Sequence, residues 1–267
     1  MFRKPCVAGQ FYPSDPAELE KTVKNFLIDN TLKERAVAVI SPHAGYMYSG
    51  GVAGELFSNV IVPDDIILIG PNHTGLGEAV SIMPSGKWEL PLGAVTINEK
   101  LAKWLLDEST MFSPDISAHL REHSLEVQLP FLYVLNRNIN IVPITVMPLG
   151  YDECLEVGSA IARAITKSGK DTLIVASSDM NHYEADKKTR EKDSLAIKEA
   201  LALNAKGLLD VTTSKKISMC GVVPATTAIV AAKALGASKA RLVKYATSGE
   251  TSGDYKQVVG YAGIIIQ

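Results

Sequence analysis

The sequence has few cysteines, no long apolar run and no excess charge of either sign. Only 3 of its 267 residues are cysteines, and an odd number at wide spacing is not a disulfide framework. A reducing compartment is the simpler interpretation. No stretch approaches the roughly 18 uninterrupted apolar residues of a membrane span, and the opening residues hold no apolar run of signal-peptide length. We therefore expect a cytoplasmic protein that is not associated with a membrane.

The charge balance and the missing motifs exclude further classes of protein. The formal net charge is -2, so no basic surface points to nucleic acid as a partner. The chain holds no HExxH, no CxxC pair, no P-loop and no GxSxG. Hydrophobic residues make up 46% of the chain, which is ordinary for a globular protein with a sizeable core. Because we find neither a linker nor a repeat, we predict one domain over residues 1–267.

Short apolar, β-branched segments stop abruptly at polar, glycine or proline residues and alternate with helical patterns. They predict strands at 36–40, 64–70, 139–147, 171–177, 240–246 and 258–266. Apolar residues at a period of 3.6 predict helices at 98–107, 152–167 and 184–203, and Pro224 and Gly236 delimit a later one. Buried strands alternating with helices indicate a sheet covered on both faces. We predict a three-layer α/β fold, α-β-α, around a largely parallel or mixed sheet.

Histidines follow the ends of several predicted strands. His43 follows the first strand in SPH, His73 follows the second in GPNH, and His182 follows the fourth in SSDMNH. In open α/β sheets, ligands bind at the carboxyl ends of the strands. A lone histidine at such an end is more often a loop or capping residue. Two in matching positions, His43 and His73, favour a shared role as metal ligands.

Cys220 lies just ahead of the predicted helix that Pro224 opens. A helix N-terminus stabilises a thiolate, which is both the nucleophilic and the metal-ligating form of cysteine. The alternative is a small buried apolar residue, the usual place of a free cysteine. Cys154, inside an amphipathic helix, is predicted to pack. With the two histidines above, Cys220 predicts a metal site of two His and one Cys.

Asp179 and His182 belong to an unusually polar cluster after a buried strand. His182 is a candidate general acid or base because its unperturbed pKa lies near physiological pH. The alternative is that these residues cap a helix beginning near Glu184. Capping explains one of them but not all.

His123 is a further candidate for acid–base chemistry. A carboxylate from Glu122 or Glu126 could orient it through its second ring nitrogen. The alternative is a polar helix start before LPFLYVL. His119, in SAHLRE, we expect on the surface.

Seven motifs in a fixed order span nearly the whole chain. They are PCVAGQFYP (5–13), SPHAGYMYSG (41–50), GPNHTG (70–75), EHSLEVQLPFL (122–132), SSDMNHY (177–183), MCG (219–221) and VVGYAG (258–263). This set resembles the Memo family, named for a mediator of cell motility. Microbial members form the Memo part of the AmmeMemoRadiSam system, so the resemblance implies radical-SAM companion proteins as partners. It also implies a fold similar to the class III extradiol dioxygenases.

Those dioxygenases hold non-haem Fe(II) with two histidines and a glutamate. By resemblance, His43 and His73 match the two histidines, and Cys220 stands where the carboxylate would be. A thiolate is softer than a carboxylate, so the resemblance implies one Fe or Cu ion, and zinc also fits. The further pocket residues that the resemblance implies are His123, His182 and Asp179.

Three hypotheses for the function follow. The first is a metal-dependent redox or dioxygenase-like enzyme, in which the pocket histidines move protons. The second is a protein without turnover that uses the same pocket to bind a metal, a small molecule, a peptide or a partner. The third is a hydrolase or transferase with Cys220 as nucleophile, beside His182 and Asp179. The third ranks last, because it leaves two further histidines without a role.

Overall fold

A computed structural model describes residues 2–29 and 32–267 of the chain. Its centre is a block of parallel strands in the order β8-β3-β9-β2. Their bounds are β2 (Ala38–Ser41), β3 (Asp65–Pro71), β8 (Asn140–Val146) and β9 (Thr172–Ser177). These strands correspond to the first four predicted apolar segments. Their carboxyl ends therefore meet at one edge of the sheet.

Further strands extend this block on both sides. On one side β12 runs antiparallel to β2 and pairs with β10 and β11. On the other side β6 runs parallel to β8 and is followed by β5 and β1, while β4 pairs with β8 and β7. The bounds are β1 (Phe2–Arg3), β4 (Val80–Ile82), β5 (Lys87–Leu90), β6 (Gly93–Ile97), β7 (Ser113–Pro114), β10 (His182–Glu184), β11 (Ala240–Thr247) and β12 (Val258–Ile266).

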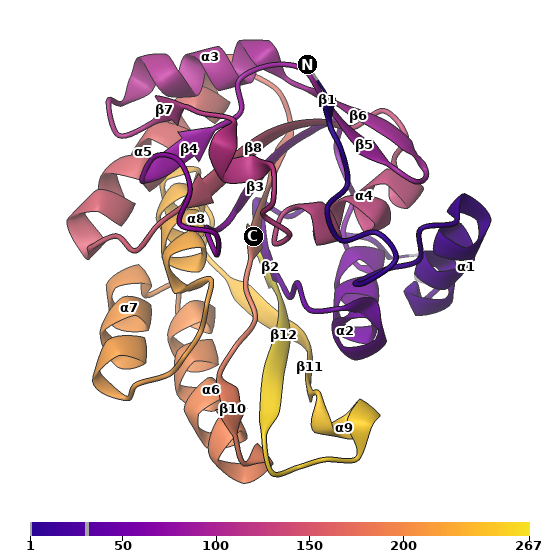
Figure 1. Ribbon diagram of the computed structural model, residues 1–267. Helices are drawn as coiled ribbons and strands as arrows, with labels where there is room; N and C mark the ends of the chain where they lie inside the picture. Colours follow the sequence, from indigo (N-terminus) through magenta and orange to yellow (C-terminus); the bar gives the residue numbers. More distant parts are fainter. Residues whose placement is uncertain (1, 30–31) are drawn as a thin grey trace.

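Helices cover both faces of the sheet (Figure 1). One face carries α1 (Pro16–Phe26), α2 (Tyr46–Ser58) and α4 (Leu129–Leu135). The other carries α3 (Glu99–Glu108), α5 (Tyr151–Ser168), α6 (Asp186–Leu201), α7 (Ala205–Ser214) and α8 (Val222–Ala234). Short helices complete the chain: the 3₁₀ turns η1 (Ser117–His119) and η2 (Glu126–Gln128), and α9 (Gly249–Ser252).

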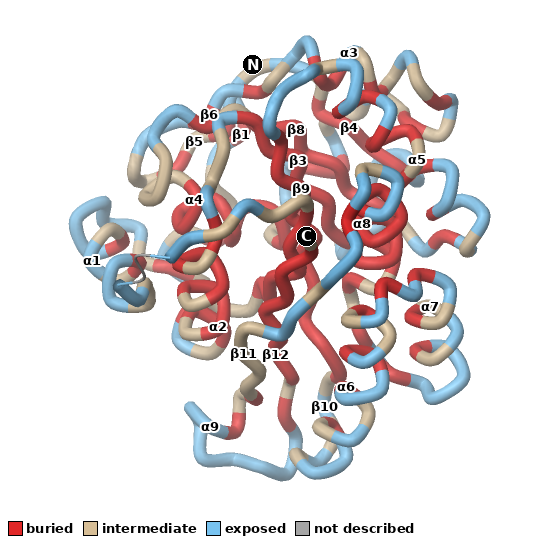
Figure 2. The backbone as a smooth tube through the Cα atoms, turned by 180° about the vertical axis from the view of Figure 1, so that it is seen from behind, coloured by how far each residue is buried: buried red, intermediate tan, exposed pale blue. Residues whose placement is uncertain are grey.

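The alternation of side chains along the strands explains the two layers. In β3, Ile66 and Leu68 enter one core and Ile67 and Ile69 enter the other. Figure 2 shows the central strands as a continuous buried band between exposed outer helix faces. This architecture confirms the predicted three-layer α/β fold around a largely parallel or mixed sheet. Among the described residues, no helix has both the length and the apolar character needed to cross a bilayer.

Two helices near the N-terminus were not predicted, and α2 shows why. Its sequence YMYSGGVAGELFS is glycine-rich and lacks a strong amphipathic pattern. A Cβ at Gly50 or Gly54 would lie only 2.6 or 2.4 Å from atoms of Phe26, the last residue of α1. The glycines therefore let α2 pack closely against the end of α1, which no local pattern reveals. The predicted helix 184–203 also differs, since α6 ends at Leu201 and a separate α7 follows.

Candidate metal centre

The six residues singled out in the sequence line one cavity of about 490 Å³ at the carboxyl edge of the parallel strands. The loops after β2, β3 and β9 bring in His43, His73 and Asp179. The remaining three come from other parts of the chain. They are His123, in the loop before η2, His182, at the start of β10, and Cys220, in the loop before α8.

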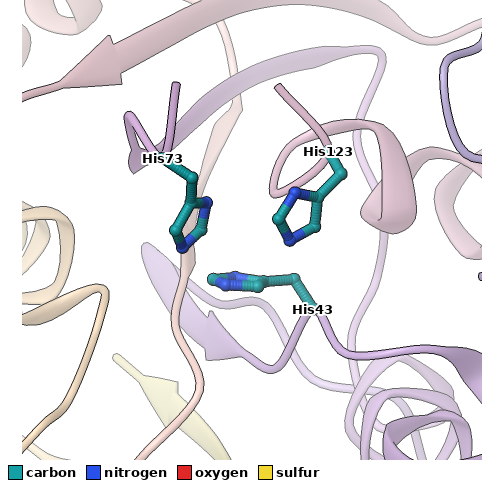
Figure 3. A group of neighbouring side chains, drawn as sticks. All are labelled: His43, His73 and His123. Atoms are coloured by element: carbon teal, nitrogen blue, oxygen red, sulfur yellow. The ribbon is translucent and has the colours of Figure 1, made fainter. Parts of the chain in front are cut away.

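Three of these histidines converge in the cavity. One ring nitrogen from each of His43, His73 and His123 lies within 4.8 Å of the others. The rings of His73 and His123 stack with centroids 4.7 Å apart, and His43 meets both edge-on at 5.3 and 5.5 Å. Figure 3 shows the three rings around one shared space. This cluster could hold a metal ion.

Hydrogen bonds to the Nδ1 atoms determine which nitrogens are free. His73 Nδ1 lies 2.8 Å from Glu122 Oε1, and His182 Nδ1 lies 2.7 Å from the Ser218 carbonyl oxygen. His43 Nδ1 lies 2.8 Å from Ser177 Oγ. A carboxylate and a carbonyl can only accept, so Nδ1 of His73 and of His182 donates, and Nε2 has a lone pair whenever the ring is neutral. Although burial lowers the pKa of His73, the Glu122 carboxylate raises it overall, so metal binding to His73 displaces the Nε2 proton of the charged form. Partners of this kind fix the tautomer of metal-binding histidines.

The same tautomer follows for His43 from the surroundings of Ser177. The Ser177 hydroxyl donates to the Ser124 carbonyl oxygen at 2.7 Å, so its oxygen accepts from His43 Nδ1. His43 is 2% exposed, and burial with the three nearby histidines holds its pKa well below the usual range. Its Nε2 is therefore a neutral acceptor aimed at the cavity.

Glu122 orients His73 rather than His123. Its buried carboxylate accepts from His73 N at 2.6 Å and from Ser124 N at 2.9 Å, besides the ring contact. Burial alone would raise the pKa of Glu122, but His73 and the Ser124 N–H outweigh it and lower the pKa to about 2. His123 Nδ1 lies 3.6 Å from Glu122, too far for a hydrogen bond. The other expected orienting residue, Glu126, faces away into the N-terminal segment.

Cys220 is half-buried and faces the cavity. Its Sγ lies 3.2 Å from His43 Nε2 and accepts from Asp179 N at 3.3 Å. A Cβ at Gly221 would approach the Ser177 carbonyl oxygen to 2.2 Å, so only glycine lets this loop lie against the end of β9. Burial raises the pKa of the Cys220 thiol, and the Asp179 carboxylate raises it further. Cys154 is buried in α5, as predicted.

Asp179 is buried against the first residues after β2. Its Oδ1 accepts from His43 N at 2.8 Å. Burial raises its pKa to about 7, although the backbone N–H groups of His43 and Ala44 favour the charged form. The capping alternative is wrong, because α6 begins at Asp186 and no side chain caps it.

His119 contradicts its expected surface position. It is fully buried in η1, and its ring lies 6.0 Å from that of Trp88. Its polar neighbours in the sequence misled the prediction, because the buried packing comes from a distant strand. The site also contains residues that the sequence did not single out for it. They are Phe11, Glu122 as the partner of His73, Ser177, Tyr183, Ser218 and Tyr261.

Comparison with known proteins agrees with the sequence motifs. The family model described as "Memo-like protein" matches residues 3–265. MEMO1 family protein MK0963 of Methanopyrus kandleri is 41% identical, over 100% of this chain and 99% of its own. A MEMO1 family protein of Aquifex aeolicus is 43% identical over 98% of each chain.

A solved structure supports the fold alone. The uncharacterized protein JW3007 from Escherichia coli K12 superimposes with a TM-score of 0.58 at 14% sequence identity. The match covers 86% of this chain and 100% of that one. The family model and the relatives match over nearly the full length of the chain. This chain belongs to the Memo-like protein family.

Proposed function

We propose that this protein binds one redox-active metal ion and is a metal-dependent redox enzyme of dioxygenase-like type. His43, His73 and Cys220 are the proposed ligands. The observation that carries the proposal is that nitrogens of His43, His73 and His123 lie within 4.8 Å of one another in one cavity, where Cys220 Sγ lies 3.2 Å from His43 Nε2. His123, His182 and Asp179 surround the proposed ion as groups that bind and release protons.

The distance between His43 and Cys220 and the chemistry of the donors fit such an ion. Metal–nitrogen and metal–sulfur bonds of about 2.0–2.3 Å place neighbouring donors of a tetrahedral site about 3.3–3.5 Å apart. His43 Nε2 and Cys220 Sγ are 3.2 Å apart. Imidazole and thiolate donors suit iron, copper and zinc better than magnesium or calcium. Iron or copper is the proposed ion, and zinc also fits the donor set.

The raised pKa of Cys220 is consistent with a ligand role. A buried thiol beside a carboxylate stays protonated in the absence of a cation. A divalent ion deprotonates a coordinating thiol, so binding releases a proton. His43 Nε2, the nearest base, accepts the hydrogen bond of that thiol in the metal-free protein.

The surrounding polar residues have the properties that proton transfer requires. Asp179 has a pKa of about 7 and therefore exists in both protonation states near neutral pH. His182 has a pKa lowered by burial, and its Nδ1 is held by Ser218. When bound, the metal would supply redox chemistry and open positions for a ligand. The protein supplies the cavity and the groups that hold protons around it.

Metal analysis tests the proposal directly. We expect about one equivalent of iron or copper in wild-type protein purified without oxygen, and its loss in Cys220→Ser and His43→Ala. His123→Ala should retain the metal. Loss in His123→Ala with retention in Cys220→Ser would replace the proposed set by the three-histidine cluster. No metal in the wild type, and none after reconstitution, would reject the metal site.

The second candidate is a protein that binds without turnover. The replacement of the expected carboxylate by an oxidisable cysteine favours it, because a thiolate is vulnerable beside activated oxygen. In this case the metal binds but no oxygen is consumed with any catechol. Small-molecule or peptide ligands and radical-SAM companion proteins are proposed partners of either form. The cytoplasmic location stays a prediction.

The contact between Cys220 and His43 favours a third candidate, a cysteine nucleophile. A Cys–His pair at hydrogen-bond distance is the usual geometry for thiol activation. The raised pKa of Cys220 opposes it, since a nucleophile needs the thiolate. Rapid alkylation of Cys220 by iodoacetamide at neutral pH in metal-free protein would support this candidate, and slow alkylation would reject it.

A further inference from the structure

The N-terminal motif PCVAGQFYP contributes no proposed metal ligand, yet it forms part of the cavity wall. It lies between β1 and α1 and folds into a tight turn. Gly9, with φ of +80°, donates from its N–H to the Tyr12 carbonyl oxygen at 2.7 Å. The Phe11 N–H donates to the Val7 carbonyl oxygen at 2.9 Å. The turn presents Phe11 towards the cavity.

A buried carboxylate fixes this turn to the site. Glu126 accepts from Cys6 N at 2.9 Å, from Val7 N at 3.1 Å and from the Tyr12 hydroxyl at 2.6 Å. Arg3 forms an ion pair with the same carboxylate, and both side chains are fully buried. Since Glu126 lies only three residues after His123, the two segments are held together.

Phe11 occupies the boundary between two cavities. It lines the 490 Å³ metal cavity and a neighbouring cavity of about 600 Å³. Its ring lies 4.9 Å from the His123 ring at an angle of 57°. Its carbonyl oxygen accepts from Tyr46 N, at the start of α2, at 2.8 Å. The backbone of Phe11 is therefore held independently of its ring.

His123 differs from the other three cavity histidines in how it is held. Each of the others has its Nδ1 in a hydrogen bond, whereas none is made by the His123 ring within the described part of the chain. Around the ring lie the stack with His73 at 4.7 Å, the Phe11 ring at 4.9 Å and the His43 ring at 5.5 Å, and the Glu122 carboxylate is 3.6 Å from Nδ1. Ring packing, together with the nearby Glu122 charge and without any hydrogen bond, therefore determines where its nitrogens point.

We propose that Phe11 is the positioning residue for His123, and that through it the N-terminal motif shapes the metal cavity. Without the Phe11 ring, the His123 ring loses its stack with His73 and turns away from the cavity. The purpose of this arrangement rests on the proposed metal site. The placement of His123 itself does not, so the two can be tested separately.

The first test uses metal-free protein with labelled histidines and nuclear Overhauser spectroscopy. The wild type should show a contact between the His73 and His123 rings. We expect Phe11→Leu and Phe11→Ala to lose it and Phe11→Tyr to keep it. Phe26→Leu is the matched control, because Phe26 lines the neighbouring cavity and contacts Tyr46 and Phe131 but no histidine. Persistence of the contact in both Phe11→Leu and Phe11→Ala would overturn the proposal.

The second test uses Co²⁺ as the metal and azide as a small anionic ligand that binds the metal at a position not occupied by a protein side chain. A hydrogen bond from His123 to bound azide predicts about tenfold weaker azide binding in His123→Ala. Phe11→Leu should weaken it similarly, and the double variant should show no further loss, because both changes remove one interaction. Additive losses would mean that Phe11 acts without His123. If the wild type binds no Co²⁺, the metal site fails, and the first test still decides the role of Phe11.

Discussion

Two buried polar clusters lie within a few residues of each other in this protein, and they are built on opposite rules. Around Glu126, the carboxylate is matched by the Arg3 cation, two backbone N–H groups, the Tyr12 hydroxyl and the Cys6 thiol, and it does not line the cavity that holds the histidines. In the cavity proposed to bind a metal, His43, His73 and His182 are each held through Nδ1, and among the described residues their Nε2 atoms make no hydrogen bond that fixes them to the backbone.

The difference distinguishes polar groups that stabilise the fold from polar groups that remain available to bind a ligand. A fully satisfied buried network specifies one arrangement of the chain. A group that is anchored through one atom and free at another retains a position for a ligand. The cluster at Glu126 should therefore contribute to stability, and the cavity should contribute to binding. The predictions below test this contrast and extend it to a buried carboxyl group and a strained residue elsewhere in the chain.

The largest effect is expected from Arg3→Met. It leaves the Glu126 carboxylate buried without its cation, which typically costs about 3–5 kcal/mol of unfolding free energy. Urea unfolding measures the loss. Arg137→Met is the matched control, because its ion pair with Glu20 is exposed and should contribute less than about 1 kcal/mol. Equal losses in the two variants would refute the structural role of the cluster. Adding Glu126→Gln to Arg3→Met should recover much of the stability.

A buried carboxyl group without a direct ion pair should show the opposite behaviour. Burial raises the pKa of Asp193 to about 6, from an ordinary 3.8, although the Tyr245 hydroxyl and the Asn181 N–H favour the anion. Between these values the folded state holds a proton that the unfolded state has released. The contribution of Asp193 to stability therefore falls as pH rises from about 4 to 6.

Asp193→Asn should remove this dependence. The unfolding free energy of the variant relative to wild type should increase by about 2–3 kcal/mol between pH 4 and pH 7. Urea unfolding at both pH values measures it. A difference that does not change with pH would mean that Asp193 titrates at its ordinary value.

Glu122→Gln should weaken metal binding while leaving the fold intact. The Glu122 carboxylate orients His73 and increases the basicity of its ring, and the change removes this negative charge. Such partners of metal-binding histidines are typically worth about 10–100-fold in metal affinity. Titration with Co²⁺ measures the effect. Glu153→Gln, at the start of α5 and outside the cavity, is the control for loss of charge and should leave the affinity unchanged. Unchanged affinity in Glu122→Gln would exclude His73 as a ligand.

The smallest effect concerns backbone strain at the cavity mouth. Tyr183 lines the cavity with φ of 60°, a conformation that costs a non-glycine residue about 1–2 kcal/mol. Asparagine tolerates it better, so Tyr183→Asn should gain about 0.5–1 kcal/mol in thermal or urea unfolding. Lys216→Asn, with φ of 51° outside the cavity, should gain a similar amount. A gain at Lys216 alone would mean that the Tyr183 ring offsets its strain by packing.

The strands that form the site could be predicted because their signal is local. β2, β3 and β9 are continuous apolar segments that end in polar loops, and burial on both faces requires that pattern. His43 and His73 follow from it, since parallel strands bring their carboxyl ends to one edge. The helix α2 gave no such signal, because its glycines are needed only for contact with α1.

The partners of the site residues could not be predicted. Glu122 directly precedes His123 and Glu126 follows it three residues later. Glu122 nevertheless orients His73, and Glu126 holds the N-terminal turn. Which carboxylate meets which residue depends on contacts between segments about 50 and 120 residues apart. His119 was misplaced for the same reason.

From the sequence follow the α/β class and the residue types that gather at one edge of the sheet, because apolar periodicity and strand ends are local properties. The family followed from the resemblance of the seven ordered motifs. The three-dimensional packing establishes which nitrogens of His43, His73 and His182 are free, that Cys220 contacts His43, and that the tilted Phe11 ring lies against His123. These depend on the packing of loops from distant parts of the chain, where a few ångströms separate a ligand from a neighbour.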